Sequence, residues 1–217
     1  MSAPATSPRH FRRVAADERR AGLIEATLDC VAEHGLRGTT LREVAARAGV
    51  TNGLIRHHFD NKEQLLLAAY RHTIDRLTVP GRAALARADL PPHARLGLFV
   101  AANLGGAVVD PRMFSLWANF ISMIHADPAI GAVHRDGYLG FREQVEPLIA
   151  DVLSAEGRPA GPERCRALAI AVNALLDGLW LEGSMLSSDF AGGEVVALGV
   201  NGVASLMGVT LEIPKEE

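Results

Sequence analysis

The residues best suited to recognition chemistry lie in a run of hydrogen-bond donors that follows Gly49. Counted at about 100° per residue from an inward-facing Ile55, this run puts its polar side chains on one face of a short helix. That face comprises Thr51, Asn52, Gly53, Arg56 and His57. Hydroxyl, amide and guanidinium groups suit the base edges and phosphates of DNA. The alternative is a plain helical hairpin whose polar residues are merely solvated.

A second candidate set surrounds Asp177, the one charged residue in the run 167–181. At helical spacing, Asp177 shares a face with Asn173, Trp180 and Ser184. An expected earlier helix adds an aromatic face of Phe114, Trp117 and Phe120. A carboxylate among tryptophans is costly unless it has a partner, either a cationic ligand held by charge and aromatic faces or an arginine, Arg164 or Arg166. The aromatic residues have core packing as their other interpretation.

Two apolar helices near the C-terminus are expected to need a partner chain. The last one, Glu194 to Met207, is apolar on too many sides to stand alone. We expect it to join the apolar side of the Asp177 helix in an intersubunit four-helix bundle. The expected interface residues are Leu168, Val172, Leu175, Leu179, Val196, Val200 and Val203.

The elements that position these residues all have helical spacing, so the predicted fold class is all-α with about nine helices. A first helix, Asp17 to His34, is followed by Gly35, which is placed to stop it. Thr40 and Glu43 have the spacing of a capping box that opens a second helix ending at Gly49. Thr51 can cap the third helix. These short helices predict a helix-turn-helix head.

Beyond Pro80 the helices are longer, roughly 15 to 25 residues, and are separated by proline-containing breaks. We therefore divide the chain into a flexible tail (1–16), a helix-turn-helix domain (17–62) and a ligand-binding and dimerisation domain (63–217). Arg9, Arg12 and Arg13 in the tail are either a solvated charge run or an arm that touches DNA.

Composition describes an ordinary folded protein, with 48% hydrophobic and 22% charged residues. Two distant cysteines, no signal-like start and no uninterrupted apolar run long enough for a membrane span indicate a cytoplasmic protein without a membrane partner. The net charge of -3 is uneven: 9 Lys and Arg face 7 Asp and Glu through Asp60, and 13 face 18 beyond it. No phosphate loop, nucleophile elbow or metal-spaced His or Cys pair is present, so we expect neither an enzyme nor a cofactor.

The N-terminal third resembles the DNA-binding domain of the tetracycline-repressor (TetR) family. The resemblance is carried by the runs 39–51, 54–59 and 61–66. It implies a homodimeric transcriptional regulator, usually a repressor, that binds operator DNA and a small-molecule effector. By the same resemblance Thr51 and Lys62 are phosphate contacts and Thr40 meets the DNA backbone, whereas His58 and Phe59 support the fold. This chain has Arg56 and His57 where the family commonly has one or two tyrosines.

The run 174–181, Ala-Leu-Leu-Asp-Gly-Leu-Trp-Leu, resembles the BetI-type, choline-pathway branch of that family. This resemblance implies a repressor released from its operator by choline or another quaternary or cationic amine. The ligand-binding residues expected on this basis are Phe114, Trp117, Phe120, Asn173, Asp177 and Trp180. A different effector, or activation in place of repression, is the alternative.

Overall fold

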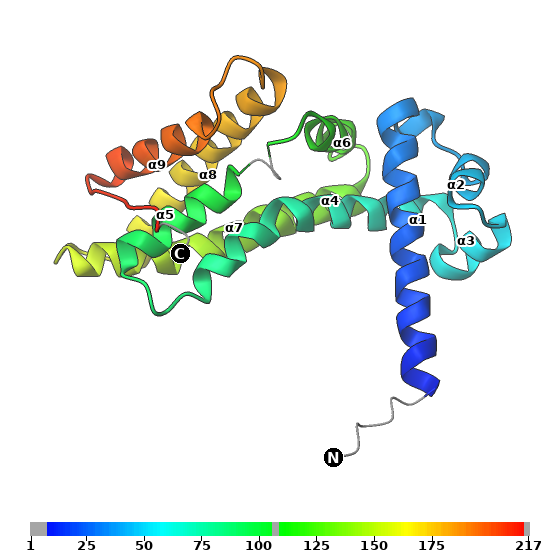
Figure 1. Cartoon of the computed structure of the whole chain (residues 1–217), viewed down its shortest axis with the longest axis horizontal. Coiled ribbons are helices and arrows are strands. Elements are labelled where there is room, and N and C mark those ends of the chain that lie inside the picture. The colour runs from blue at the N-terminus through cyan, green and yellow to red at the C-terminus, as the bar shows by residue number, and fades with distance from the viewer. Residues whose placement is uncertain (1–7, 106–108, 215–217) are drawn as a thin grey trace. The chain divides into compact units, whose positions relative to one another are not determined.

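The structure is a computed structural model that describes residues 8–105 and 109–214, with side chains from residue 16 onward. Within these residues every regular element is an α-helix, and nine helices are present (Figure 1). The predicted all-α class is confirmed. The chain divides into two compact units, Met1–His72 and Thr73–Glu217.

The first unit contains α1 (Pro8–Gly38), α2 (Leu41–Ala48), α3 (Asn52–Phe59) and the start of α4 (Lys62–Leu85). Its core is made of fully buried apolar side chains from each of these helices, Leu28, Val31, Val44, Ile55 and Leu65. Gly35 breaks the helical backbone of α1 at φ 68°, as expected, and one further turn follows before Gly38.

Two expected boundaries differ from the observed ones. Residues 8–16, expected in the tail, form the first turns of α1, because proline fits a first helical turn and the arginines and alanines that follow favour helix. Residues 1–7 lie outside the described residues. The first unit extends to His72 because Leu65 and Tyr70 of α4 are buried and His72 Nε2 lies 2.9 Å from Glu25 Oε1.

The second unit continues with five helices. These are α5 (Pro92–Asn103), α6 (Pro111–Ile121), α7 (Pro128–Ala155), α8 (Pro162–Met185) and α9 (Glu194–Met207). The prolines that were expected to separate helices sit in the first turns of α5 to α8, where a missing backbone N–H costs nothing. Asp110 and Asp127 cap α6 and α7 by accepting hydrogen bonds from backbone N–H groups.

The core of the second unit is centred on α8, which packs against α6, α7 and α9. Val172 of α8 is buried together with Phe99 of α5, Leu148 of α7 and Val203 of α9. On length and composition alone α8 could cross a membrane. Its packing against three helices explains the same apolar composition, because a core helix must be apolar on several sides.

Candidate nucleic-acid interface and ligand cavity

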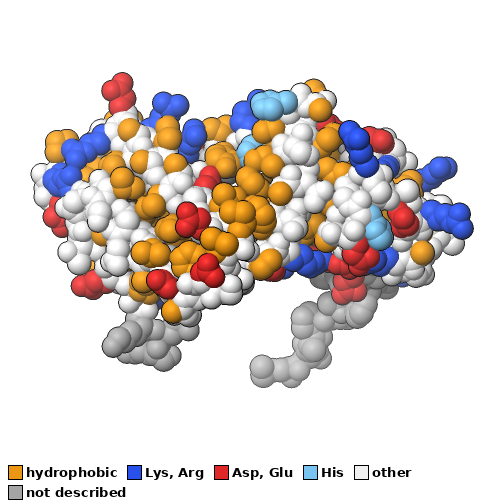
Figure 2. All heavy atoms as spheres, turned by 90° about the horizontal axis from the view of Figure 1, so that it is seen from above, with side chains coloured by type: hydrophobic (Ala, Val, Ile, Leu, Met, Phe, Trp, Pro, Cys, Tyr) orange, Lys and Arg blue, Asp and Glu red, His pale blue; other side chains and the backbone are white. Residues whose placement is uncertain are grey.

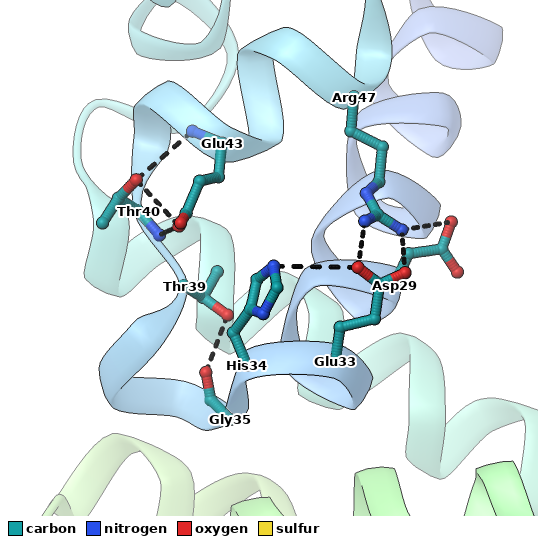
Figure 3. Close-up of polar contacts among 8 residues, drawn as sticks. All are labelled: Asp29, Glu33, His34, Gly35, Thr39, Thr40, Glu43 and Arg47. Carbon is teal, nitrogen blue, oxygen red and sulfur yellow. Dashed lines mark hydrogen bonds and ion pairs between the residues drawn. The ribbon is translucent and has the colours of Figure 1, made fainter.

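The helix-turn-helix begins at a complete capping box. Thr40 Oγ1 accepts a hydrogen bond from Glu43 N at 3.2 Å, and Thr40 N donates to Glu43 Oε2 at 2.8 Å (Figure 3). The Thr40 hydroxyl also donates to Glu43 Oε2 at 2.9 Å, and this bond, together with the one from Thr40 N, holds the pKa of Glu43 below its usual value. Gly49 closes α2 with φ 65° and donates its N–H to carbonyls of the last turn. The predicted cap and turn are therefore present, and Thr40 is exposed beside α2.

The recognition helix α3 presents the expected polar face. Thr51 caps it by accepting a hydrogen bond from Leu54 N at 3.4 Å. Ile55 and Phe59 are buried, and the Arg20 guanidinium lies 4.9 Å from the centre of the Phe59 ring. The exposed residues of this segment are Thr51, Asn52, Gly53, Arg56 and His57. All five residues expected to contact DNA here are thus accessible.

Lys62, expected to contact phosphate, is half-buried at the start of α4. Its Nζ donates a hydrogen bond to the Leu36 carbonyl at 3.2 Å. An ammonium group has three donors, so this bond orients the side chain and leaves donors for a phosphate.

An ion-pair cluster that sequence reasoning missed ties α2 to α1 (Figure 3). Arg47 donates to both carboxylate oxygens of Glu33, with a distance of 2.6 Å to Oε1, and lies 3.9 Å from Asp29. The bidentate bond lowers the pKa of Glu33 and raises that of Arg47. The partners are distant in sequence and no local pattern indicates their pairing.

Both cysteines are buried, as expected of small core residues. Burial raises the pKa of each thiol. Neither group therefore resembles an activated nucleophile.

The second unit contains a partly open cavity of about 80 Å³, lined by residues of α4, α5, α6, α7 and α8. Four of the six expected ligand-binding residues line it: Trp117, Asn173, Asp177 and Trp180. Phe114 lies behind them, with its ring centre 6.4 Å from that of Trp117 and 5.9 Å from that of Trp180. Phe120 is fully buried on α6 and does not line this cavity, so the structure does not bring it together with the other expected ligand-binding residues.

Asp177 is held by two neutral donors. Tyr138 donates its hydroxyl proton to Asp177 Oδ2 at 2.7 Å, and Asn173 Nδ2 donates to the same oxygen at 2.8 Å. The expected arginine alternative is not observed, because these neutral groups hold the carboxylate where Arg164 or Arg166 was considered. The residue is exposed at its edge, yet cavity-wall atoms remove enough water to raise the pKa of Asp177, against the opposing effect of its two hydrogen bonds.

Other cavity residues were not anticipated from the sequence. They are Ile74, Leu77, Thr78, Asn103, Gly137, Tyr138, Phe141 and Leu176. They come from four helices, and only tertiary packing brings them together. A tyrosine or asparagine in an amphipathic helix carries no local sign of facing a cavity.

The expected dimer residues pack largely within their own chain. Val172, Val200 and Val203 are buried, and the rest are half-buried against the same core. The remaining residues of this set are Leu168, Leu175, Leu179 and Val196. Burial of Val172, Val200 and Val203 within their own chain leaves them little surface for a partner. The four half-buried residues keep part of their surface, so an interface through them stays a prediction.

α8, its C-cap Leu186 and α9 also carry exposed apolar side chains. The large ones are Ile170, Met185, Leu186, Leu198 and Leu206, each between 39% and 50% exposed. Figure 2 shows hydrophobic side chains gathered on this side of the second unit, with a few acidic ones among them. We call this set the α8–α9 face. Apolar surface of this kind is typical of an interaction site.

A helix-turn-helix head followed by a helical unit with a ligand-sized cavity defines the class of ligand-responsive transcriptional regulators. Residues 23–69 match the family described as bacterial regulatory proteins, tetR family, and residues 92–208 match the BetI-type transcriptional repressor C-terminal domain. The chain belongs to the TetR family of transcriptional regulators and has a BetI-type C-terminal domain. It is therefore a DNA-binding regulator and not an enzyme.

Individual relatives agree with this assignment. The HTH-type transcriptional regulator BetI of Burkholderia thailandensis is 36% identical over 172 residues, covering 79% of this chain and 85% of that protein. A crystal structure of a putative transcriptional regulator from Pseudomonas aeruginosa PAO1 has 32% identity and a TM-score of 0.80, and covers 88% of this chain and 91% of that one. A putative regulator from Saccharomonospora viridis, solved in complex with choline, has 20% identity, a TM-score of 0.64 and coverage of 88% and 96%, which shows the shared fold.

Proposed function

We propose that this protein is a cytoplasmic repressor whose homodimer leaves its operator when a small cationic amine binds the cavity of the second unit. The observation that carries the proposal is that Asp177 and both tryptophans, Trp117 and Trp180, line one small cavity. A carboxylate supplies negative charge and indole faces supply cation–π attraction, and together these groups suit a small organic cation.

The two tryptophans form a corner. Their ring centres are 5.3 Å apart and their planes cross at 82°. A cation seated in the corner meets two aromatic faces, a geometry typical of ammonium recognition. The cavity size suits a ligand of a few heavy atoms and disfavours long acyl chains.

Relatives support the same ligand class. The C-terminal unit matches the BetI-type family, and a regulator of the same fold has been crystallised with choline. Choline is a small quaternary ammonium ion, so it is a suitable first probe.

The DNA-binding end of the proposal rests on the exposed donors of α3. We infer that Arg56, Asn52 and Thr51 contact base edges and phosphates in the major groove, with Gly53 allowing close approach, and that His57, Thr40 and Lys62 contribute at the backbone. TetR-family regulators bind operator DNA and typically act as dimers. A dimer formed through the α8–α9 face would have to hold two such helices roughly 34 to 36 Å apart to enter successive major grooves.

A ligand that prefers the dimer spacing unsuited to DNA weakens operator binding through its differential affinity for two states. Coupling of this kind is typically about 1 to 3 kcal/mol. Ile74, Leu77 and Thr78 of α4 line the cavity, and the same helix begins at Lys62. One helix therefore carries both ligand-contacting and DNA-contacting candidates.

Tryptophan fluorescence offers a direct test, because the chain has two tryptophans and both line the cavity. We expect choline to change the emission of the wild-type protein in a saturable manner. Asp177→Asn should weaken binding about 10-fold or more, since a charge-assisted interaction is lost. Glu182→Gln removes a charge from an exposed position on the same helix and should leave binding unchanged. Equal affinity in the wild type and Asp177→Asn would overturn the cationic ligand class.

A further inference from the structure

Two further polar side chains, Asn103 of α5 and Thr78 of α4, line the cavity. Asn103 is buried, and its Nδ2 donates a hydrogen bond to the Phe99 carbonyl at 2.8 Å. A Cβ added at Gly81 would lie 2.5 Å from this nitrogen, which shows that Nδ2 is packed against the backbone of α4. The carbonyl acceptor and the close packing fix the amide orientation, because Oδ1 cannot donate. Oδ1 is therefore the amide atom left for a ligand.

Thr78, like Asn103, has its donor already engaged and keeps an acceptor. Its hydroxyl donates to the Ile74 carbonyl at 3.0 Å. A hydroxyl has one proton, so the remaining capacity of Thr78 Oγ1 is as an acceptor. Both side chains consequently offer acceptors to the cavity.

The hydroxyl of Tyr138 and one amide proton of Asn173 are already committed to Asp177 Oδ2. Apart from the indole N–H groups and the second amide proton of Asn173, the described polar side chains of the cavity wall present acceptors or a carboxylate. A ligand carboxylate would meet the charge of Asp177 and leave these acceptors unpaired, which is unfavourable in a buried site.

We infer that Asn103 Oδ1 and Thr78 Oγ1 form a donor-selecting subsite, and that the effector carries a hydroxyl or amine N–H a short distance from its cationic centre. The inference rests on the proposed cation site and adds the second functional group of the ligand. Ligands that carry a carboxylate in place of that donor are rejected.

Matched ligand pairs test the subsite in the wild-type protein. Choline and n-propyltrimethylammonium differ in one hydroxyl replaced by a methyl group, and ethanolamine and n-propylamine form the same pair without N-methylation. From the net value of one neutral hydrogen bond, we expect the donor-bearing member of each pair to bind about 2- to 12-fold more tightly by tryptophan fluorescence titration. Glycine betaine should bind more weakly than either quaternary cation.

Equal or reversed affinities within both pairs, or glycine betaine binding as tightly as choline, would overturn the subsite while the cation site stands. Failure of every cation to bind would instead overturn the proposed function, and the subsite with it. The two failures are therefore distinguishable.

Variants assign the selectivity to residues. Thr78→Val and Asn103→Leu should each reduce the preference for choline over n-propyltrimethylammonium toward one, with little change in affinity for the latter. Asn119→Leu is the matched control, because Asn119 makes the same side-chain bond to a carbonyl four residues earlier but lies outside the cavity lining. A full preference retained in both Thr78→Val and Asn103→Leu would contradict the assignment. Thermal melting identifies any variant that fails to fold, and the nearly isosteric Thr78→Val keeps the test available if Asn103→Leu does.

Discussion

The oxygens of Asp177 have different surroundings. Oδ2 accepts from both Tyr138 and Asn173, so in the proposed site Oδ1 is the oxygen that would meet a ligand. Because the two donors are neutral, they orient the carboxylate without cancelling its charge. Loss of hydration raises the pKa of Asp177 and makes its ionised form more responsive to a cation that replaces water.

The raised pKa of Asp177 predicts a pH-dependent affinity. A fixed-charge cation such as choline binds the ionised carboxylate, so affinity should be full at neutral pH. It should fall as the pH decreases through the Asp177 pKa, starting above the ordinary aspartate value of about 3.9. Fluorescence titration from pH 7.5 to the limit of folding measures this.

Asp177→Asn is the control for that profile and should show a weak, flat affinity. His134 also titrates near the cavity, because its ring centre lies 4.7 Å from that of Tyr138. Burial lowers the pKa of His134, and protonation of His134 as the pH falls would also disfavour a cationic ligand. A His134→Gln variant that keeps the wild-type profile assigns the effect to Asp177. A profile that disappears in His134→Gln would contradict the assignment.

Arg56 is the exposed guanidinium on α3, and we expect Arg56→Ala to weaken operator binding. If Arg56 contacts phosphate, affinity falls uniformly across sequences and the salt slope decreases by about 1; if it contacts guanine, one position loses about 1 to 3 kcal/mol of specificity. Fluorescence anisotropy with labelled operator DNA at several salt concentrations distinguishes these results. Arg71→Ala, at an exposed position on α4, serves as control, and equal affinity of both variants would exclude Arg56 as a contact.

Single residues differed in how far the sequence could predict them. Asp177 and Trp180 share one helix, so helical spacing alone placed them together. Tyr138 and Asn103 reach the cavity from α7 and α5, and their contribution depends on packing that no local spacing encodes. Phe120 shows the converse, because an aromatic residue on an apolar face serves core and pocket equally well until the neighbouring helices are placed.

At the scale of elements, the close approach of α7 to α4 shapes the cavity wall. A Cβ added at Gly137 would lie 2.6 Å from Ile74 Cγ2, whereas one at Gly140 meets nothing within 4 Å. We expect Gly137→Ala to destabilise the protein by about 1 to 3 kcal/mol, because a short β-branched side chain has little room to move. Its affinity for choline should also change.

Gly140→Ala is the matched substitution on the same helix. It should stabilise the protein by about 0.5 to 1 kcal/mol, since a Cβ at this half-buried position meets nothing within 4 Å and a helix interior favours alanine over glycine. Chemical denaturation of both variants measures the difference. Equal stabilities would show that α7 and α4 are not in close contact at this point.

Several helix boundaries were predictable because their signals are local. Thr40, Gly49 and the prolines of α5 to α8 act within a few residues of themselves. The orientation of α8 was not predictable, because the helix is apolar on several sides and residue spacing does not tell which side packs against its own chain. Val172 therefore lies in the core, while Ile170, two residues away, is exposed.

At the scale of the whole molecule, the α8–α9 face is expected to join two copies of this chain. Leu198→Glu places a charge on that face and should yield a monomer in light scattering with much weaker operator binding, because one head makes half the contacts. Met123→Glu changes an exposed apolar residue elsewhere and should stay dimeric. A monomeric wild type, or a dimeric Leu198→Glu protein with full operator affinity, would contradict this interface.

The central claim is that a cation in the cavity weakens operator binding. The most direct measurement is fluorescence anisotropy of labelled operator DNA, taken from the region upstream of the protein's own gene, during titration with choline. We expect choline to release the wild-type protein and to leave the Asp177→Asn complex intact at the same concentration. If choline binds the cavity by tryptophan fluorescence and the wild-type complex with DNA is unaffected, the proposed switch is contradicted.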